Sequence, residues 1–360
     1  MKILITGACG FVGSTLALAF LEDAGAAGDR AQIVGFDNLS RLGSETNRLQ
    51  LIRRGVRVFH GDLRAAEDLE QLPPCDWVID AAANPSVLAG VDGQSSSKQL
   101  LDHNLSSTVH LLEYCRKHGA GFLLLSTSRV YSIPPLAGLP MAQHNGAFCL
   151  DETRPLPPGV SRRGVDEAFS TQPPISLYGV SKLASELLAL EYGETFGFPV
   201  WINRCGVLAG AGQFGRADQG IFSFWINSWL RGKPLKYIGF GGHGWQVRDA
   251  LHPRDLLSLL KKQFARSGSV DSRVFNLGGG PENAMSLLQL SQWCQRRFQN
   301  RQVLVDPRER RFDIPWMVMD DRRARSFWDW QPQTPLAGIL EEIALHAEAH
   351  DNWLEISGSA

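Results

Sequence analysis

Residues 1–14 read MKILITGACGFVGS. Met1–Thr6 has the apolar character of a parallel strand that is buried on both faces, and helical periodicity follows the glycines. Gly7, Gly10 and Gly13 stand between the two elements. In such a turn the first glycine allows a tight bend, the second lets backbone N–H groups approach a pyrophosphate, and the third lets helix and strand pack closely. The stretch predicts a dinucleotide-binding turn, and glycines that merely form a turn are the alternative.

The order of strand and helix set by this stretch continues along the chain. Further strands are expected over residues 31–37, 56–60, 77–82, 121–126 and 200–203, and helices are clearest over 104–118 and 176–196. Alternation of this kind predicts an α/β fold with right-handed crossovers. We therefore expect a Rossmann-like, doubly wound parallel sheet.

The regular alternation is interrupted by a Pro-, Gly- and Ser-rich stretch over residues 134–174. A loop of that length is uncommon unless it is functional or forms a subdomain. We predict a nucleotide-binding domain over residues 1–205, with an insert at about 132–175 and a return of the chain near 246–265. Residues 206–360 are expected to form mainly a smaller, substrate-binding lobe.

Composition excludes several classes of protein. The 360 residues include 36 Lys and Arg against 37 Asp and Glu, so no excess of cations is present to bind nucleic acid. Six cysteines lie far apart, without a CxxC pair or a nearby histidine cluster, which predicts reduced thiols and no metal site. Because there is no apolar run of about 18 residues, no membrane span is expected. The composition favours a cytoplasmic protein.

Two carboxylates extend the predicted nucleotide site. Asp37 ends the second expected strand, where a carboxylate can accept both ribose hydroxyls and would repel a 2′-phosphate, so we expect NAD rather than NADP. An ordinary strand-end cap is the alternative for Asp37, and Arg41 could pair with a 2′-phosphate. Asp62 is either a partner of the adenine amino group or a helix N-cap.

A tyrosine and a lysine supply the candidate chemistry. Tyr178 and Lys182 form YGVSK, and their i,i+4 spacing places both side chains on one helix face. The ammonium, together with the positive nicotinamide, would lower the pKa of the phenol toward the working range. Thr127 follows a buried strand and could share a hydrogen bond with the substrate hydroxyl. An exposed helix pair and a turn-stabilising threonine are the alternatives.

The segments TGACGFVGS, FDNLSR, STSRVY and YGVSK occur in this order and resemble the extended short-chain dehydrogenase/reductase family, which acts on nucleotide sugars. The resemblance covers most of the chain and implies catalysis by Thr127, Tyr178 and Lys182. It also implies a homodimer built from two helices per subunit, although Leu183, Leu187 and Leu190 fit either an interface or a core. The expected NAD contacts are Gly7, Gly10, Phe11, Val12, Gly13, Asp37, Asn38, Ser40, Arg41, Asp62, Leu63, Ala81, Ala82, Asn104, Ser126, Tyr178 and Lys182.

Further segments are similar to one branch of that family, the CDP-tyvelose (CDP-paratose) 2-epimerases. They are FDNLSR, the basic residue before VY, an insert containing Asp166 and Glu167, GQFGRADQG (212–220) and QVRDALH (246–252). The substrate contacts implied are Ser128, Arg129, Gln213, Gln219, Arg248, Arg310 and Asp313. Arg248 would hold the diphosphate, and a surface ion pair is the alternative for it and for Arg310.

Differences from the family pattern bear on the activity. Ser128 and Arg129 replace the Asp and Glu of sugar dehydratases, which disfavours elimination. Asp80 starts an Asp-Ala-Ala-Ala segment where His-Leu-Ala-Ala is usual, and Ala209 replaces the tyrosine of a Tyr-Gly pair. We predict a redox-neutral nucleotide-sugar epimerase that acts at C2 of a CDP-hexose. A 4-epimerase or another redox-neutral enzyme on UDP- or GDP-sugars, a dehydratase, and a non-catalytic NAD-binding relative are the alternatives.

Overall fold

The computed structural model describes residues 1–23, 31–91, 93, 96–216, 219–266 and 271–358. The chain divides into two compact units. The first unit comprises Met1–Thr127, Leu177–Arg204 and Pro253–Phe275, and the second comprises Ser128–Ser176, Cys205–His252 and Asn276–Ala360. The Pro-rich insert thus belongs to the second unit, and the return to the first runs over 253–275, where sequence reasoning expected 246–265.

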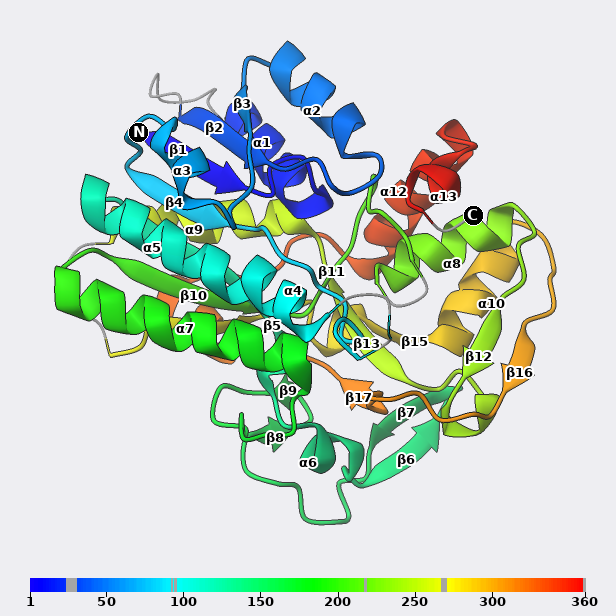
Figure 1. Ribbon diagram of the computed structural model, residues 1–360. Helices are drawn as coiled ribbons and strands as arrows, with labels where there is room; N and C mark the ends of the chain where they lie inside the picture. Colours follow the sequence, from blue (N-terminus) through cyan, green and yellow to red (C-terminus); the bar gives the residue numbers. More distant parts are fainter. Residues whose placement is uncertain (24–30, 92, 94–95, 217–218, 267–270, 359–360) are drawn as a thin grey trace. The chain divides into compact units, whose positions relative to one another are not determined.

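A seven-stranded sheet of order β14-β10-β5-β4-β1-β2-β3 carries the expected fold (Figure 1). Its pairs β1–β2, β1–β4, β2–β3 and β4–β5 are parallel, which confirms the doubly wound arrangement. The strand bounds are β1 Lys2–Thr6, β2 Gln32–Asp37, β3 Arg57–His60, β4 Trp77–Asp80, β5 Gly121–Thr127, β10 Val200–Cys205 and β14 Val274–Leu277. Sequence reasoning missed β14, because its four residues carry no periodic signal of their own.

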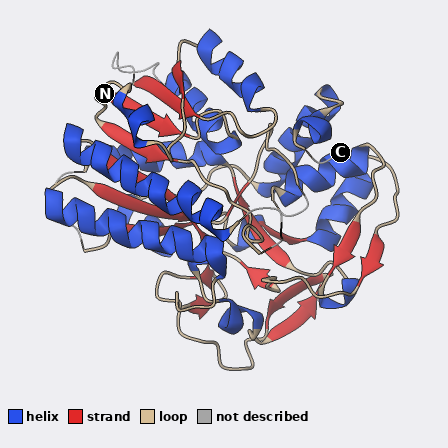
Figure 2. Ribbon diagram, in the orientation of Figure 1, coloured by secondary structure: helices blue, strands red, loops and turns tan. Residues whose placement is uncertain are grey.

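Helices cover this sheet, as Figure 2 shows. Their bounds are α1 Phe11–Glu22, α2 Ser44–Arg53, α3 Ala66–Glu70, α4 Ser97–Leu101, α5 Ser107–His118, α7 Ser176–Phe196 and α9 Leu256–Ala265. A π-helical turn, Asp102–Ser106, joins α4 to α5. The helix expected over 104–118 is therefore the end of a longer helical segment.

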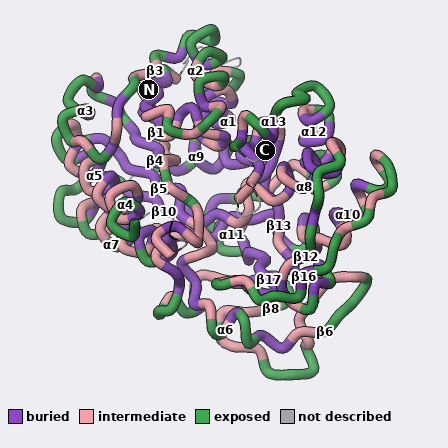
Figure 3. Tube along the Cα trace, turned by 45° about the vertical axis from the view of Figure 1, so that its right-hand side comes forward, coloured by how far each residue is buried: buried purple, intermediate pink, exposed green. Residues whose placement is uncertain are grey.

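Alternate residues of the strands face two separate sets of helices. Leu4, Val78 and Leu124 pack in one core cluster with Leu111 of α5 and Ala189 of α7. The neighbouring positions pack on α9. The ring of Trp77 lies 4.7 Å from that of Phe264, and the indole of Trp201 donates to the carbonyl of Gln263 at 2.9 Å. The central strands β1, β4, β5 and β10 are thus buried on both faces, as their continuous apolar runs predict (Figure 3).

The second unit contains short strands and a helical layer. The strands are β6 Met141–His144, β7 Ala147–Leu150, β8 Val160–Ser161, β9 Gly164–Val165, β11 Val207–Leu208, β12 Lys236–Ile238, β13 Val247–Leu251, β15 Ala284–Ser286, β16 Leu304–Asp306 and β17 Trp316–Met317. The helices are α6 Ile133–Ala137, α8 Ile221–Leu230, α10 Leu287–Arg297, α11 Arg322–Trp328, α12 Leu336–Ala349 and α13 Trp353–Ile356. The Pro-rich insert thus forms two antiparallel hairpins, β6–β7 and β8–β9.

Tryptophans of α8 form the core of the second unit. Trp225 and Trp229 are buried in one cluster with Ile339 and Ile343 of α12. The indole of Trp225 donates to Ser291 Oγ, and that of Trp229 donates to the carbonyl of Gln299, each at 2.9 Å. Both polar N–H groups are therefore satisfied inside the core. The two residues therefore belong to the core rather than to a surface on which a base could stack.

The structure also bears on the other classes of protein considered above. All six cysteines are free thiols. Within the described ranges, no helix has the length and apolar character needed to cross a membrane. The same residues contain no group of three or more His, Cys, Asp or Glu side chains arranged to hold a metal ion.

Candidate active site

Two glycines of the first turn have no room for a side chain. Gly7 has φ +59°, and a Cβ on it would lie 2.9 Å from Ala82 Cα and 3.0 Å from the carbonyl oxygen of Ala81. A Cβ on Gly13 would lie 2.2 Å from the carbonyl oxygen of Gly7. Helix α1 then begins at Phe11, and its N-cap residue is Gly10, which provides no side-chain cap. Its first N–H groups, those of Phe11 and Val12 among them, form an end that favours an anion.

Asp37 is tied directly to this turn. Its Oδ2 accepts the N–H of Cys9 and its Oδ1 accepts the N–H of Leu39, both at 2.8 Å. Burial raises the pKa of the carboxyl, and the two N–H groups oppose that rise. The carboxylate is thus both a local cap and a fixed acceptor beside the turn. It keeps lone pairs with which it could accept ribose hydroxyls.

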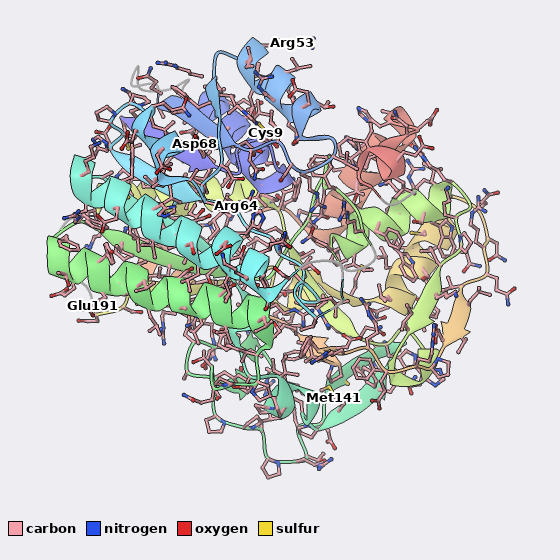
Figure 4. The ribbon with its side chains drawn as sticks, viewed as in Figure 1. Cys9, Arg53, Arg64, Asp68, Met141 and Glu191 are labelled. Carbon is pink, nitrogen blue, oxygen red and sulfur yellow. The ribbon has the colours of Figure 1, made fainter. Side chains whose placement is uncertain are left out.

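The neighbouring thiol is chemically inert. Burial and the charge of Asp37 raise the pKa of Cys9 to about 12, so it stays protonated near neutral pH. Its carbonyl accepts the side-chain N–H of Asn47 at 3.0 Å. Figure 4 labels Cys9 in the turn before α1. Cys9 therefore holds the turn through its backbone.

Asp62 follows β3 and is held by Arg64. The guanidinium donates to both carboxylate oxygens, at 2.9 and 2.6 Å, and these bonds keep the pKa of Asp62 well below its ordinary value. Asn38 donates to the same carboxylate at 3.2 Å. The N-cap of α3 is Ala65, so the N-cap alternative for Asp62 was wrong. Arg64 and Asp68, whose carboxylate accepts the N–H of Asp62, are labelled in Figure 4.

Three further expected NAD contacts, Ser40, Arg41 and Leu63, lie after the ends of β2 and β3. Ser40 N–H donates to Asn38 Oδ1 at 3.1 Å, and the carbonyl of Arg41 accepts the hydroxyl of Ser44 at 2.7 Å. The carbonyl of Leu63 lies 2.7 Å from His110 Nδ1. These contacts order the loops at the carboxyl ends of the strands, which is where parallel sheets bind nucleotides.

Thr127 is the last residue of β5, and a buried ion pair fixes that end of the strand. Ser126 Oγ donates to Glu186 Oε1 at 2.5 Å, and Arg204 Nη2 lies 2.7 Å from Glu186 Oε2. Glu186 stands one helical turn after Lys182 on α7. The Ser126–Glu186 hydrogen bond therefore ties β5 to α7, the helix that carries the candidate base. Sequence reasoning missed Glu186, although its i,i+4 spacing from Lys182 was visible.

Tyr178 and Lys182 occupy the first turns of α7, and both are buried. Tyr178 is 6% exposed and packs with Ala89 and Leu100, while Lys182 is 2% exposed. The exposed helix pair considered as their alternative is thus wrong. A buried ammonium requires compensating charge or hydrogen bonds. Burial raises the pKa of Asp80, and the charge of Lys182 opposes that rise; sequence reasoning had noted Asp80 only as a departure from the family pattern.

Asn104 lies in the π-helical turn and bridges two elements. Its Oδ1 accepts the N–H of Asn84 at 2.8 Å, and its Nδ2 donates to the Asn84 carbonyl and to Ser181 Oγ, each at 3.1 Å. The extra residue of a π turn rotates a side chain away from the regular helical face. Asn104 thereby joins the loop after β4 to α7 beside Lys182.

The candidate substrate residues of the second unit include three arginines. Arg248 Nη2 lies 3.2 Å from Asp313 Oδ1 and also donates to the carbonyl of Ile314 at 3.0 Å. Burial lowers the pKa of Arg248 to about 10; Asp313 opposes this, while Arg129 and Arg310 add to it. The guanidinium is still cationic at neutral pH, so the second unit carries a concentration of positive charge.

Other polar atoms lie near this arginine cluster in the sequence and the fold. Asp313 Oδ2 and Gln246 Oε1 are buried and have no hydrogen-bond partner. Arg129 Nη1 donates to the carbonyl of Phe312 at 3.2 Å, and Ser128 begins the 3₁₀ turn that carries Arg129.

The two expected glutamine contacts hold loops of the second unit. Gln213 Nε2 donates to the carbonyl of Leu208 at 2.6 Å. The backbone carbonyl of Gln213 accepts the indole N–H of Trp353. Gln219 pairs with Arg216 through backbone hydrogen bonds. Residues 217 and 218 of the GQFGRADQG segment lie outside the described residues.

The first unit fits a dinucleotide. The two glycine positions form a cradle that any Cβ would fill, an uncapped helix begins there, and a fixed carboxylate stands beside it. Phe11, Val12 and Gly13 would hold the pyrophosphate by their N–H groups, and Asp37 would accept the ribose hydroxyls.

Comparison with known proteins gives a consistent result. A model of the NAD dependent epimerase/dehydratase family matches residues 3–278. A CDP-paratose 2-epimerase of Salmonella typhi is 30% identical over 357 residues, which cover 92% of this chain and 95% of that protein. UDP-glucuronate 4-epimerase 2 of Arabidopsis thaliana is 24% identical, over 95% of this chain and 75% of that protein.

A solved structure shows the same fold. UDP-glucuronic acid 4-epimerase from Bacillus cereus, in complex with UDP-glucuronic acid and NAD, superposes with a TM-score of 0.74. The two chains are 25% identical, and the superposition covers 97% of this chain and 99% of the other.

Proposed function

This chain belongs to the NAD-dependent epimerase/dehydratase family, and we propose that it epimerises C2 of a CDP-hexose. The observation that carries the proposal is the buried Tyr178–Lys182 pair, together with Ser128 and Arg129 at the sequence positions where a dehydratase has its acid and base. Such a pair can move a proton and position a hydride transfer, whereas Ser128 and Arg129 offer no carboxyl that could expel water. The choice of C2 and of CDP is supported by the 30% identity to a CDP-paratose 2-epimerase.

In the proposed mechanism Tyr178, as phenolate, takes the proton of the sugar hydroxyl. The ammonium of Lys182 lowers the pKa of the phenol, and Thr127 orients the hydroxyl by a hydrogen bond. The glycine turn and Asp37 would hold NAD, which would supply the hydride acceptor and donor for the carbinol carbon. The substrate becomes a keto-sugar that turns in the site, and Tyr178 gives the proton back when hydride reaches the opposite face. Atoms and electrons therefore balance without another reactant.

The arginines of the second unit support a diphosphate substrate. Arg129 and Arg310 act electrostatically on Arg248, so the cluster holds three guanidinium groups. Arg248 forms an ion pair with the carboxylate of Asp313. Guanidinium groups bind phosphate oxygens strongly and often in a bidentate manner. We assign the substrate diphosphate to this cluster.

A homodimer is part of the proposal. Leu187 on α7 is 62% exposed, whereas Leu190 packs partly against the core of the first unit. Only the first of these is available to a helix–helix interface. The mass in solution, measured by light scattering for the protein and for Leu187→Glu, tests this; a wild-type monomer would contradict it.

The experiment that tests the function follows deuterium. Purified protein is incubated, without added cofactor, with CDP-glucose deuterated at C2, and the products are observed by NMR. We expect a new 2-epimer that retains the deuterium at C2, because hydride returns to the carbon it left. Epimerisation with loss of deuterium to water would indicate proton abstraction from carbon and contradict the mechanism. UDP-glucose and GDP-mannose in separate tubes test the base, and a product altered at C4 would favour the 4-epimerase.

A further inference from the structure

A glutamine of the second unit has one end of its side-chain amide paired and the other end unpaired. Gln246 directly precedes β13 and is 7% exposed. Its Nε2 donates to the carbonyl of Ile238, the last residue of β12, at 3.3 Å. Because a carbonyl oxygen accepts hydrogen bonds and cannot donate them, this contact fixes which end of the amide carries the oxygen. That oxygen, Oε1, is buried and has no hydrogen-bond partner among the described residues.

A chain of contacts places this amide beside the arginine to which we assign the diphosphate. Arg248 Nη2 lies 3.2 Å from Asp313 Oδ1. The other carboxylate oxygen of Asp313 lies 3.6 Å from the position that a Cβ on Gly239 would occupy. Gly239 directly follows Ile238, whose carbonyl holds Gln246. The end of β12 therefore has Gln246 on its carbonyl and the Arg248–Asp313 ion pair next to it.

Aromatic rings stand on the loop that Gln246 closes. The hydrogen bond between Gln246 and Ile238 joins the two ends of the loop over residues 239–245. Phe240 and Trp245 lie near opposite ends of this loop, and both contact the ring of Phe148 of β7 edge to face, with ring centroids 5.7 and 5.8 Å away. All three rings are half-buried. Such rings offer a surface on which a flat base can stack, and stacking does not distinguish one pyrimidine from another.

The unpaired oxygen, by contrast, distinguishes the two pyrimidines. Cytosine carries an exocyclic amino group at C4, which donates hydrogen bonds, whereas uracil carries an oxygen at that position, which accepts them. The amide of Gln246 cannot turn its nitrogen toward uracil without giving up the bond to the Ile238 carbonyl. A buried acceptor that meets a second acceptor stays unpaired, and this costs binding energy.

We propose that Gln246 is a specificity-determining residue of the substrate site, whose Oε1 accepts the exocyclic amino group of a cytosine base. The inference rests on the proposed function, because it places the base beside the arginines to which we assign the diphosphate. Phe240 and Trp245 supply a stacking face that serves cytosine and uracil equally. The fixed acceptor then makes the site prefer CDP to UDP, since a site built to pair with a donor rejects the analogue that lacks it.

The test changes the protein and the ligand in one thermodynamic cycle. Dissociation constants for CDP and UDP are measured by titration calorimetry with the purified wild-type protein and with Gln246→Met, which keeps the length of the side chain and removes the amide oxygen. We expect the wild type to bind CDP about 10-fold more tightly than UDP, and Gln246→Met to bring this ratio to about 1. A general loss of packing would weaken both nucleotides alike and leave the ratio unchanged.

Two further variants serve as controls. Gln292→Met is the same substitution at an exposed position of α10, and it should keep the wild-type affinities for both nucleotides. Phe240→Leu removes one ring of the stacking face. It should weaken CDP and UDP together by about 10-fold, so that their ratio stays that of the wild type.

A wild-type ratio near 1, or a ratio that Gln246→Met leaves unchanged, overturns the inference. If Gln246→Met does not fold, the wild type is titrated with the 4-deamino analogue of CDP, which has hydrogen in place of the amino group. This analogue should bind about 10-fold more weakly than CDP, and equal binding overturns the inference. Failure of the wild type to bind either nucleotide removes both the diphosphate assignment and the inference.

The proposed function fails in a different way. A protein that prefers CDP through Gln246 but does not epimerise CDP-glucose retains the inference and contradicts the proposed activity, because the binding measurement requires no turnover.

Discussion

The two units of the chain handle buried charge differently. In the first unit, opposite charges are matched: Glu186 bonds Arg204, and Asp80 lies within the electrostatic reach of Lys182. A carboxylate and a cation that neutralise each other leave no net charge to bind an anion, but they can still position a proton donor or acceptor.

Around Arg248 in the second unit, guanidinium groups outnumber carboxylates, because Arg129 and Arg310 join Arg248 against Asp313 and Asp249. Arg248 is bonded to Asp313, yet Arg129 and Arg310 also act on it and help to lower its pKa. Such an excess is stable only beside solvent or an anion. The comparison agrees with the proposal that the first unit moves protons and that the arginines of the second bind the substrate diphosphate.

The largest expected effect is the loss of proton transfer in the first unit. Tyr178→Phe should reduce turnover by about 10³-fold or more, because the proton acceptor is lost. Tyr192→Phe, on the same helix, removes only a hydroxyl that donates to Glu113 and should leave turnover unchanged. Both rates come from the NMR assay, and NAD released on denaturation is measured by absorbance. Equal rates in the two variants would refute the role of Tyr178.

A smaller effect is expected in the second unit. Arg248→Met should weaken the binding of CDP about 10- to 100-fold, the value of one or two charge-assisted hydrogen bonds. Arg296→Met, at an exposed position of α10, is the control and should bind as the wild type does. Titration calorimetry gives both affinities. If Arg248→Met binds CDP normally, the excess positive charge serves the fold and the contrast between the units disappears.

The same cation predicts a pH dependence for the second unit. Because burial lowers the pKa of Arg248 to about 10, CDP affinity should be constant at neutral pH and fall as the pH rises through 10. The direction follows because only the protonated guanidinium attracts the diphosphate. Calorimetry between pH 7 and pH 10.5 measures it, with Arg248→Met expected to lack the fall.

The smallest expected effect concerns stability. Burial raises the pKa of Asp249 to about 7, and its Oδ2 accepts the N–H groups of Gly280 and Met319. A carboxyl whose pKa is raised by folding binds its proton more tightly in the folded state, so its contribution to stability is lost as the pH rises from about 4 to about 7. Between pH 5 and pH 8 this loss is about 2 kcal/mol.

Asp249→Asn should remove that dependence. The free energy of unfolding in urea is measured at both pH values, with Asp271→Asn at an exposed position as the control. A pH dependence identical in the wild type and Asp249→Asn would show that Asp249 is ionised throughout.

The difference between the units also explains what could be predicted from the sequence. Gly7, Gly13, Tyr178 and Lys182 stand at fixed spacings that strand and helix geometry enforces, so a linear motif is enough to bring them together. The strands of the first unit were predicted within a residue or two, except β14.

The second unit offers fewer such signals. Its cluster joins Arg129, Arg248 and Arg310 across long stretches of chain, and short strands such as β13 and β17 have no periodicity to read. Those arginines were named from the family resemblance, and no spacing rule would have assembled them. The burial of Asp80 and Glu186 could not be predicted, because no pattern in the sequence shows that these two carboxylates lie inside the fold.

The hydrogen bonds of Asp37 have a consequence for engineering. Because its two oxygens accept the N–H groups of Cys9 and Leu39, the residue that would select the cofactor is also a structural part of the turn that would hold it. A designer who replaces Asp37 with a small neutral residue, in order to admit a 2′-phosphate, also leaves two backbone donors without acceptors. Exchange of cofactor preference would therefore require a second substitution that restores an acceptor for those groups, and a library that varies position 37 alone would select chiefly for folding.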